Sequence, residues 1–516
     1  MRLRSYSCPM AVAASSRRRP VQPALEGGQP DWLTRKRSLW LLAGIVVLGA
    51  AIRFSTLDQQ SFWLDEATTW GIVSHGLGHV LSTVPKSEST PPLYYVLLWL
   101  WSRVFGTGEV GLRSLSALCG TLTIPVMWAV GRRLASERIG LVAALVTAVN
   151  PLLFWYSQEA RTYALLVLLS VLSLWAFLRA LEQPSAGRLV SWGAICALTI
   201  LAHYFGAFIV AGEAVWLLVA LRRRGVLTGA GAAIALAPIV VGGAGLVPLA
   251  IHQNDGRASF ISTASGSLPY RLGQLVKQDI LGDGQPWKAL LLAIGLVLVA
   301  LALVLVLTRA SRSERDGALM MLVIGAGGVL LAFVVAAVVT DYFDTRNLLA
   351  TWPALALVVA VGFGAARAGR WGAAGLIGLV VLSLVCIANV IRDPDFQRDN
   401  WRGAVQALGS PTTARAIVAD GVGAVTLPPY LHGAAAYPPA GTPVREVDVI
   451  WVGRAGYGHP LIPVPPVALP GFQRQETRTK SYIVVRYRAP TATPVPFVNL
   501  RALYPVPARA LAYLQP

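Results

Sequence analysis

Two adjacent carboxylates lie in the segment SFWLDEAT (residues 61–68), which follows the first long apolar run of the chain. One carboxylate can accept a proton from an incoming hydroxyl group, while its neighbour orients a partner or balances charge. Acidic residues are also common in the first turn of a helix, where they interact favourably with the helix dipole. We therefore treat Asp65 and Glu66 as candidate catalytic residues, with a helix-terminal structural role as the alternative.

A second polar cluster, YSQEARTY at residues 156–163, lies between two apolar runs. A phosphate bound at Arg161 would accept paired, charge-assisted hydrogen bonds from its guanidinium group. Glu159 and Tyr163 belong to the same cluster and are candidate binding residues with it. Charged side chains at the end of a membrane span are functional candidates by default. The alternative is a turn that caps two helices and leaves Glu159 and Arg161 in solvent.

A third cluster is DYFDTRN at residues 341–347, in which Arg346 suits an anionic partner or, alternatively, an ion pair with Asp344. His203 follows an apolar run and is a candidate binding residue, with an interfacial structural histidine as the alternative. His75 and His79 are spaced i, i+4, which suits zinc on a helix face. No acidic third ligand accompanies them, so we predict no metal site.

The elements that must position these residues are membrane helices. The chain is 55% hydrophobic and 13% charged, with a mean hydropathy of +0.58, whereas soluble domains carry about 25% charged residues. Several apolar runs approach the roughly 20 residues that cross a bilayer as a helix. The sequence therefore predicts an all-α polytopic protein of a cell (plasma) membrane, in contact with the lipid bilayer on most of its surface.

The orientation of the chain in the membrane is predicted from the positions of its arginines, because cytoplasmic loops carry the excess of basic residues. The apolar run Pro91–Phe105 reaches only roughly 22 Å as a helix, less than the ~30 Å hydrocarbon core, so we interpret it as juxtamembrane or re-entrant. With the N-terminus in the cytoplasm, every later arginine cluster then also falls in the cytoplasm. About eleven spans are predicted, at residues 39–54, 112–130, 139–155, 163–178, 189–202, 205–221, 226–251, 287–307, 317–340, 348–366 and 371–391.

The predicted organisation has four parts. Residues 1–38 form a basic, disordered cytoplasmic leader, and residues 39–391 form the transmembrane module, whose first extracytoplasmic loop is 55–111. Composition changes after Ile391, where short β-rich runs alternate with Pro/Gly-rich loops. A helix at Trp401–Leu408 and strands near 416–419, 447–452 and 482–487 predict a small extracytoplasmic α/β domain at 392–490. Residues 491–516 are predicted to be a Pro-rich tail.

The net charge of +19 does not indicate nucleic-acid binding. Its arginines occur in short clusters between apolar runs and not along one face or in an aromatic-bearing module. Four cysteines show neither zinc-ligand spacing nor a disulfide framework. The placement of the basic residues therefore predicts membrane topology and no nucleic-acid partner.

Taken in order, the basic leader, the first span, WLDEA (63–67), TPPLYY (90–95) and YSQEAR (156–161) resemble bacterial GT-C glycosyltransferases. The similarity covers roughly residues 38–391 and is greatest to the protein O-mannosyltransferases and lipid A aminoarabinose transferases, glycosyltransferase family 39 and relatives. The resemblance implies a GT-C fold and a polyprenyl-phosphate sugar donor. It also implies that Asp65 is the general base, with Glu66 beside it, and that Arg161 and Arg346 bind the donor.

One position departs from the family pattern. Many relatives have His or Lys before Pro-Pro-Leu, and this chain has Thr90. Lys86 or His203 is then the possible substitute in donor binding, and a metal carried over from the family is in doubt. Nothing from the family is carried onto the C-terminal domain. A sugar on a phosphate is already activated, so no nucleotide site and no cofactor are expected, and no Walker or Rossmann glycine pattern is present.

The predicted function is transfer of a mannose-like hexose or a pentose from a polyprenyl-phosphate donor to an acceptor hydroxyl. The acceptor is a cell-envelope glycan, lipid or protein on the extracytoplasmic face, and the reaction inverts the anomeric centre with Asp65 as general base. Two alternatives remain. A lipid-linked glycan polymerase or ligase uses a similar donor, and a secondary transporter is also polytopic, although it should show repeat symmetry and charges near the bilayer midplane.

Overall fold

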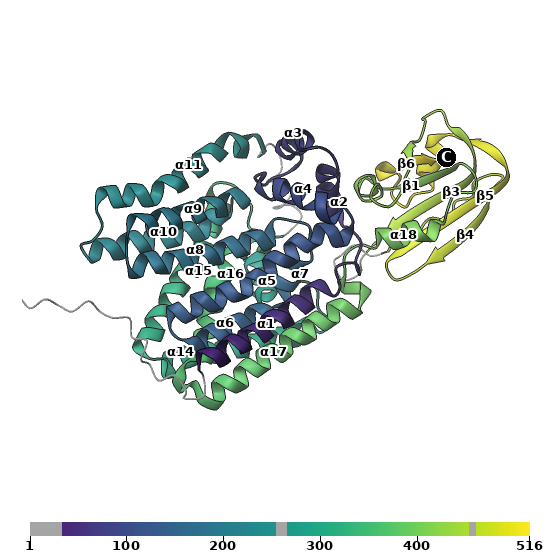
Figure 1. The fold of residues 1–516 in the computed structure, drawn as a ribbon. Coiled ribbons are helices and arrows are strands. Elements are labelled where there is room, and N and C mark those ends of the chain that lie inside the picture. Colours follow the sequence, from purple (N-terminus) through teal and green to yellow (C-terminus); the bar gives the residue numbers. More distant parts are fainter. Residues whose placement is uncertain (1–33, 254–265, 454–460) are drawn as a thin grey trace, which may run out of the picture.

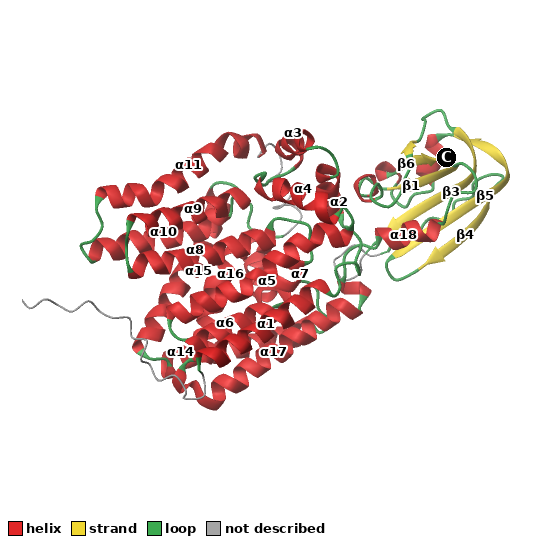
Figure 2. Ribbon diagram, viewed as in Figure 1, coloured by secondary structure: helices red, strands yellow, loops and turns green. Residues whose placement is uncertain are grey.

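The computed structural model describes residues 34–253, 266–453 and 461–516. Over these ranges the chain forms a bundle of long helices followed by a small C-terminal sheet domain (Figure 2). Helix α1 begins at Arg35, so most of the predicted leader lies outside the described residues. The predicted fold class, a polytopic helical protein with a small C-terminal α/β domain, is confirmed.

Eight helical segments of the described chain are long and apolar enough to cross a membrane. The outer ones bury little of their surface: 11% of the α11 window and 28% of the α14 window are buried inside the protein. Apolar side chains exposed to this extent require lipid as their solvent. The segments are α1 (Arg35–Phe54), α5 (Glu109–Leu134), α8 (Tyr163–Glu182), α11 (Gly229–Gln253), α14 (Lys288–Arg309), α15 (Arg312–Val338), Thr345–Gly364 and Ala366–Arg392.

The last two segments are composite. The 3-10 helix η1 (Thr345–Thr351) continues directly into α16 (Trp352–Gly364), and a short 3-10 turn precedes α17 (Gly369–Arg392). Helices α6 (Glu137–Val149) and α7 (Pro151–Ser157) are long and apolar enough only when they are taken together, and they are bent by 58° at the break between them. Of the other predicted spans, α9 (Ala186–Ala202) has 17 residues, and α10 (Gly206–Arg223) includes three charged residues. The count of eleven spans stays a prediction.

The bend between α6 and α7 has an identifiable cause. Asn150 caps α7 by accepting a hydrogen bond from the N–H of Leu153, and Pro151 occupies the first position of that helix. The freed carbonyls at the end of α6 accept hydrogen bonds from the buried guanidinium of Arg53, at 2.9 Å for Thr147 and 2.8 Å for Ala148. The break therefore ends the span early and places the polar turn at residues 158–162 at the end of the bundle.

The arginines at the C-terminal ends of α5 and α10 lie at one end of the bundle. Arg133, in the last turn of α5, pairs with Glu182 of α8 at 2.6 Å, and Arg224 donates to the carbonyl of Leu181 at 2.6 Å. The opposite end holds α2 (Leu64–Val73), α3 (Leu77–Ser87), α4 (Leu93–Phe105) and the C-terminal domain (Figure 1). The basic helix ends are thus separated from the first loop, as the topology prediction requires; the membrane side of each end stays a prediction.

The C-terminal domain is a six-stranded sheet with the order β2-β6-β1-β3-β5-β4. β1 and β3 pair in parallel, and the other neighbouring strands pair antiparallel. Helix α18 (Trp401–Leu408) packs on the sheet and begins and ends where the sequence predicted. The strands are β1 (Arg415–Ala419), β2 (Ala435–Ala436), β3 (Thr442–Val452), β4 (Gln473–Arg478), β5 (Tyr482–Val495) and β6 (Leu511–Gln515); two short helices, α19 (Gly423–Thr426) and α20 (Phe497–Ala502), complete the domain.

The sheet domain extends past Pro490, where the sequence predicted a Pro-rich tail. β5 runs on to Val495, and β6 inserts between β2 and β1. Leu500 and Tyr504 between them are buried in the hydrophobic core of the domain. Residues 491–516 therefore complete the sheet, because an apolar strand near the C-terminus satisfies the free edge of β1.

Candidate active site

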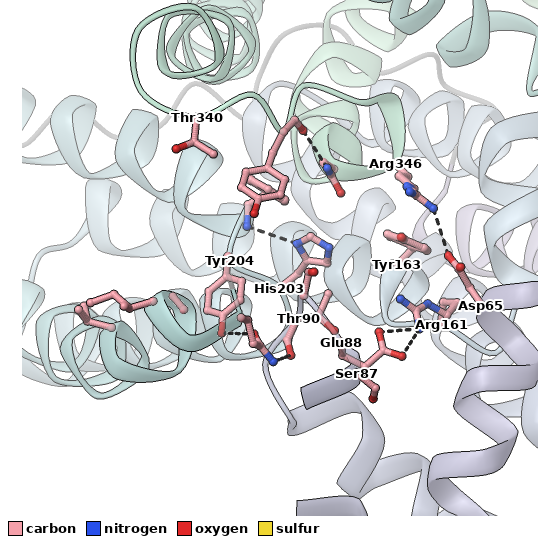
Figure 3. A pocket seen from close by; sticks show the side chains of 18 residues that line it. Asp65, Ser87, Glu88, Thr90, Arg161, Tyr163, His203, Tyr204, Thr340 and Arg346 are labelled. Atoms are coloured by element: carbon pink, nitrogen blue, oxygen red, sulfur yellow. Dashed lines mark hydrogen bonds and ion pairs between the residues drawn. The ribbon is translucent and has the colours of Figure 1, made fainter. Parts of the chain in front are cut away.

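A cavity of about 730 Å³ opens at the end of the bundle that carries α2 (Figure 3). Its walls come from segments far apart in the sequence: the first turn of α2, the loop between α3 and α4, the ends of α8 and α9, the last turns of α11, and residues 340–347. The cavity brings together five of the predicted site residues. They are Asp65, Arg161, Tyr163, His203 and Arg346.

Asp65 lies in the first turn of α2 and pairs with Arg346 at the wall of the cavity. Its Oδ2 is 3.1 Å from Nη1 of Arg346, and the two side chains are 26% and 28% exposed. Arg346 is held by η1, because the side chain of Asp344 caps that helix through the backbone N–H of Arg346 at 3.1 Å. The predicted Asp344 contact is weak, with 3.8 Å between charged atoms. Arg346 is therefore oriented toward Asp65.

Glu66 occupies a different environment from its neighbour. Its carboxylate accepts two hydrogen bonds from Arg113, at 2.7 and 2.6 Å, and a third from the N–H of Ala160 at 2.9 Å. It is fully buried and does not line the cavity. Burial alone would raise the pKa of Glu66, but Arg113 and Arg398 hold the pKa below its usual value. The candidate catalytic role of Glu66 is therefore not supported by its position; it anchors α2.

Arg161 lines the cavity but has a carboxylate partner that sequence reasoning missed. Its Nη1 lies 2.9 Å from Oε2 of Glu88 and 2.8 Å from the hydroxyl of Tyr95. Burial raises the pKa of Glu88, although the positive charge of Arg161 opposes this shift. Nε of Arg161 is buried without a hydrogen-bond partner among the described residues. The sequence signal for Glu88 was the polar segment SEST (residues 87–90), which directly precedes the two prolines at 91 and 92.

Glu159 is brought near the site but not into it. Its side chain is buried and does not line the cavity, and its closest charged partner is Nη2 of Arg398 at 3.5 Å. Both carboxylate oxygens lack a hydrogen-bond partner in the described chain, and burial raises the pKa of Glu159 to about 7. Glu159 therefore lies behind the cavity wall, whereas the sequence predicted that it binds the donor.

His203 is a neutral hydrogen-bond donor at the cavity wall. It is fully buried, and burial lowers its pKa to about 3, with the charges of Arg161 and Arg346 acting in the same direction. Nδ1 accepts the N–H of Phe205 at 3.3 Å, so the proton of the neutral ring is on Nε2. Nε2 has no hydrogen-bond partner among the described residues. The ring of Tyr163 lies beside it, with 5.8 Å between ring centroids.

Lys86 is not among the cavity residues. It lies exposed in the last turn of α3, whereas the four residues that follow it line the cavity. His75 lies in the turn before α3 and His79 in the first turn of that helix, so the predicted pair does not share one helix; their tilted rings have 4.5 Å between centroids. Among the described residues, no group of three or more His, Cys, Asp or Glu is placed to hold a metal ion.

The wall opposite the charged residues is apolar. Val247, Ala250 and Ile251 of α11 line it, and the helix is otherwise largely exposed on its outer face. Gln253 fixes the end of α11 by donating to the carbonyls of Val84 and Thr90 at 3.1 and 3.2 Å. The cavity therefore has a charged end at α2 and an apolar end that leads to the bilayer-facing surface.

The chain is similar to membrane glycosyltransferases in one family model and in fold. Residues 89–242 match the family model of dolichyl-phosphate-mannose-protein mannosyltransferases. ArnT from Cupriavidus metallidurans bound to undecaprenyl phosphate is 15% identical, with a TM-score of 0.55 over 90% of this chain and 100% of that chain. The apo state of ArnT is 18% identical, with a TM-score of 0.46, and that match spans 66% of this chain and 63% of the other.

A match to the Pmt1-Pmt2 protein O-mannosyltransferase complex of S. cerevisiae is 18% identical, with a TM-score of 0.34 over 42% of this chain and 33% of that one. No curated protein sequence matches. At these identities the structural likeness concerns the fold. The predicted resemblance to GT-C glycosyltransferases of the protein O-mannosyltransferase and aminoarabinose transferase type is confirmed by the family model and the shared fold together.

Proposed function

We propose that this protein transfers a sugar from a polyprenyl-phosphate donor to an acceptor hydroxyl, with Asp65 as the general base. The observation that carries the proposal is the composition of one cavity. A partly exposed carboxylate pairs with Arg346 and lines one cavity with Arg161 and with a histidine Nε2 that has no hydrogen-bond partner among the described residues, while α11 contributes an apolar wall. This division matches an amphipathic substrate with an anionic headgroup and a hydrocarbon tail.

The acceptor hydroxyl loses its proton to Asp65 as its oxygen attacks the anomeric carbon, and the bond from that carbon to the phosphate oxygen breaks. The phosphate leaves with the bonding electron pair. Arg346, Nε of Arg161 and Nε2 of His203 supply positive charge and hydrogen-bond donors for the departing anion. Attack from the side opposite the phosphate inverts the anomeric configuration.

We assign the site to the extracytoplasmic face. The arginines after α5 and α10 gather at the other end of the bundle, and positive charge marks the cytoplasmic side. The C-terminal domain adjoins the first loop, so it shares the membrane side of the cavity (Figure 1). The acceptor is then a hydroxyl of a cell-envelope glycan, lipid or protein.

The test is a transfer assay with the full-length protein reconstituted in liposomes. Synthetic polyprenyl-phosphate hexoses and pentoses are supplied with a cell-envelope extract as acceptor source, and released polyprenyl phosphate is quantified. We expect release with at least one donor, and none with the corresponding nucleotide sugar. Turnover of a nucleotide sugar without any polyprenyl-phosphate sugar would contradict the proposal.

A further inference from the structure

The linker that leads to the C-terminal domain is bound to the residues before α2. The backbone N–H of Arg398 donates to Oε1 of Gln60 at 2.8 Å, and the hydroxyl of Ser61 donates to the carbonyl of Asp399 at 2.6 Å. Arg398 itself is 4% exposed. A loop between the membrane module and a separate domain does not need such burial, so the contact is a specific feature of the fold.

The side chain of Arg398 joins the two elements that carry the proposed active site. Its guanidinium lies over the Trp155 ring, 4.2 Å from the ring centroid, and Nη2 is 3.5 Å from the carboxylate of Glu159. Nε is 3.9 Å from Glu66, which adjoins Asp65 in α2. One buried cation therefore lies between α2 and the turn at residues 158–162 that carries Arg161.

The C-terminal domain adds a second attachment to the same loop. The hydroxyl of Tyr430 accepts the N–H of Phe62 at 2.6 Å and donates to Glu109 at 2.5 Å. Arg402 pairs with Glu109 as well. Residues 60–62, directly before α2, are thus fixed by contacts from beyond residue 392.

We propose that Arg398 is a positioning residue for sugar transfer, through which the C-terminal domain holds Asp65 in register with the donor-binding arginines. This inference rests on the proposed function. Two buried carboxylates on separate elements, Glu66 and Glu159, face one guanidinium, and removal of its charge leaves Glu159 without its closest cationic partner. α2 and the 158–162 turn then lose the cation that they share, and the hydrogen bond from the N–H of Ala160 to Glu66 remains between them. Because an error of about 1 Å in a reacting group can cost about a hundredfold in rate, the effect falls on turnover.

The test compares Arg398→Gln, Arg398→Lys and wild type in the liposome transfer assay. We expect Arg398→Gln to lower kcat at least about tenfold, with the dissociation constant for undecaprenyl phosphate changed less than twofold. Arg398→Lys keeps the charge and should recover part of kcat. The matched control is Arg415→Gln, because Arg415 is equally buried and pairs with Asp448 within the sheet. Arg415 contacts neither Glu66 nor Glu159, so this control should leave kcat unchanged at temperatures at which the sheet domain is folded.

A second variant tests the same role if Arg398→Gln does not fold. Gln60→Ala removes the acceptor of the Arg398 N–H and leaves the buried charges in place, and it should lower kcat at least about threefold without weakening undecaprenyl phosphate binding. If the wild-type protein is active and either folded variant, Arg398→Gln or Gln60→Ala, has the wild-type kcat, the positioning role of Arg398 is wrong and the proposed function still stands. Equal loss of kcat in Arg415→Gln would also overturn the positioning role, whereas an inactive wild type would overturn the proposed function with it.

Discussion

Asp65 and Arg346 form an ion pair of 3.1 Å between Oδ2 and Nη1 across 281 residues of sequence. The pair joins the first turn of α2 to the 3-10 helix η1 and lies at the wall of the cavity. Arg346 contacts the proposed base and also faces the space that the donor phosphate would occupy. A change at Arg346 is therefore expected to affect both the position of Asp65 and the binding of the donor phosphate.

Replacement of Arg346 is expected to affect both binding and turnover. A hydrogen bond to a charged group contributes about 1.5–3 kcal/mol, so Arg346→Ala should lower kcat/KM about ten- to hundredfold. Arg346→Lys keeps the charge but loses the planar geometry and should retain an intermediate activity. Arg488→Ala removes an exposed arginine of the sheet domain and is the control. Equal kcat/KM in Arg346→Ala and this control would exclude Arg346 from the site.

Arg161→Ala is expected to weaken donor use by about ten- to hundredfold, on the same physical ground. The variant also leaves the buried carboxylate of Glu88 without its cation, so a loss of stability accompanies it. The double variant Arg161→Ala/Glu88→Gln removes the unpaired charge and should regain stability without regaining donor affinity. Binding of undecaprenyl phosphate and the melting temperature, measured on both variants, separate the two effects. Full donor affinity in the double variant would reduce Arg161 to a structural ion pair.

His203 is expected to act as a neutral donor. Its pKa is lowered to about 3, so the ring stays uncharged between pH 5 and 8, and His203→Gln should leave the shape of the pH–rate profile unchanged. His203→Phe removes the N–H donor and should lower kcat about tenfold, the order expected for one hydrogen bond. A profile limb near pH 6 that disappears in His203→Gln would show that the histidine titrates.

The same histidine has a consequence for stability. The unfolded chain takes up a proton at the usual histidine pKa of 6.5, whereas the folded chain does so only at about 3. Stability is therefore lost as pH falls below about 6.5. In His203→Gln the decrease in melting temperature between pH 7.5 and 5 should be smaller than in wild type, and an unchanged decrease would contradict the buried neutral state.

Much of the membrane module was predictable because its signals are local. Apolar runs and arginine clusters predict the spans, and the apolar run at Pro91–Phe105 forms a helix, α4, of only 13 residues; that it does not cross the membrane stays a prediction. In the C-terminal domain, Trp401, Ala404 and Leu408 are buried at helical spacing in α18. β6 was missed because a single short apolar run after a Pro-rich segment has no partner visible in the sequence.

The sequence identified most of the predicted residues that line the cavity, but it did not identify the ion pairs between them. The adjacent carboxylates at residues 65 and 66 could be identified, but their separation depends on Arg113, which lies 47 residues away from Glu66. Glu159 belongs to a conspicuous polar motif, yet its burial against Arg398 follows from a linker 239 residues later, which no local pattern specifies. Long-range ion pairs therefore decide which motif residues face the cavity.

The topology has its own test with single cysteines. Lys480 lies exposed in the turn before β5, and Arg223 lies exposed at the end of α10. In a background with Cys8→Ser, which leaves the buried Cys119, Cys196 and Cys386, a membrane-impermeant thiol reagent should label Lys480→Cys in intact cells and Arg223→Cys only after lysis. The opposite labelling would place the cavity in the cytoplasm.

The central claim is the role of Asp65, and Asp65→Asn tests it most directly. The amide keeps the size of the side chain and its contact with Arg346 but removes the proton acceptor, and general base catalysis typically contributes 10²–10⁴-fold. The matched control is Asp58→Asn, an exposed carboxylate of the same loop. The control should show wild-type kcat.

The deciding measurement is the rate of sugar transfer from a synthetic polyprenyl-phosphate sugar, with the anomeric configuration of the product read by NMR. We predict that Asp65→Asn lowers kcat at least about a hundredfold while still binding undecaprenyl phosphate, and that the wild-type product is inverted. Near-normal turnover in Asp65→Asn, or a product that retains the configuration of the donor, would contradict the mechanism.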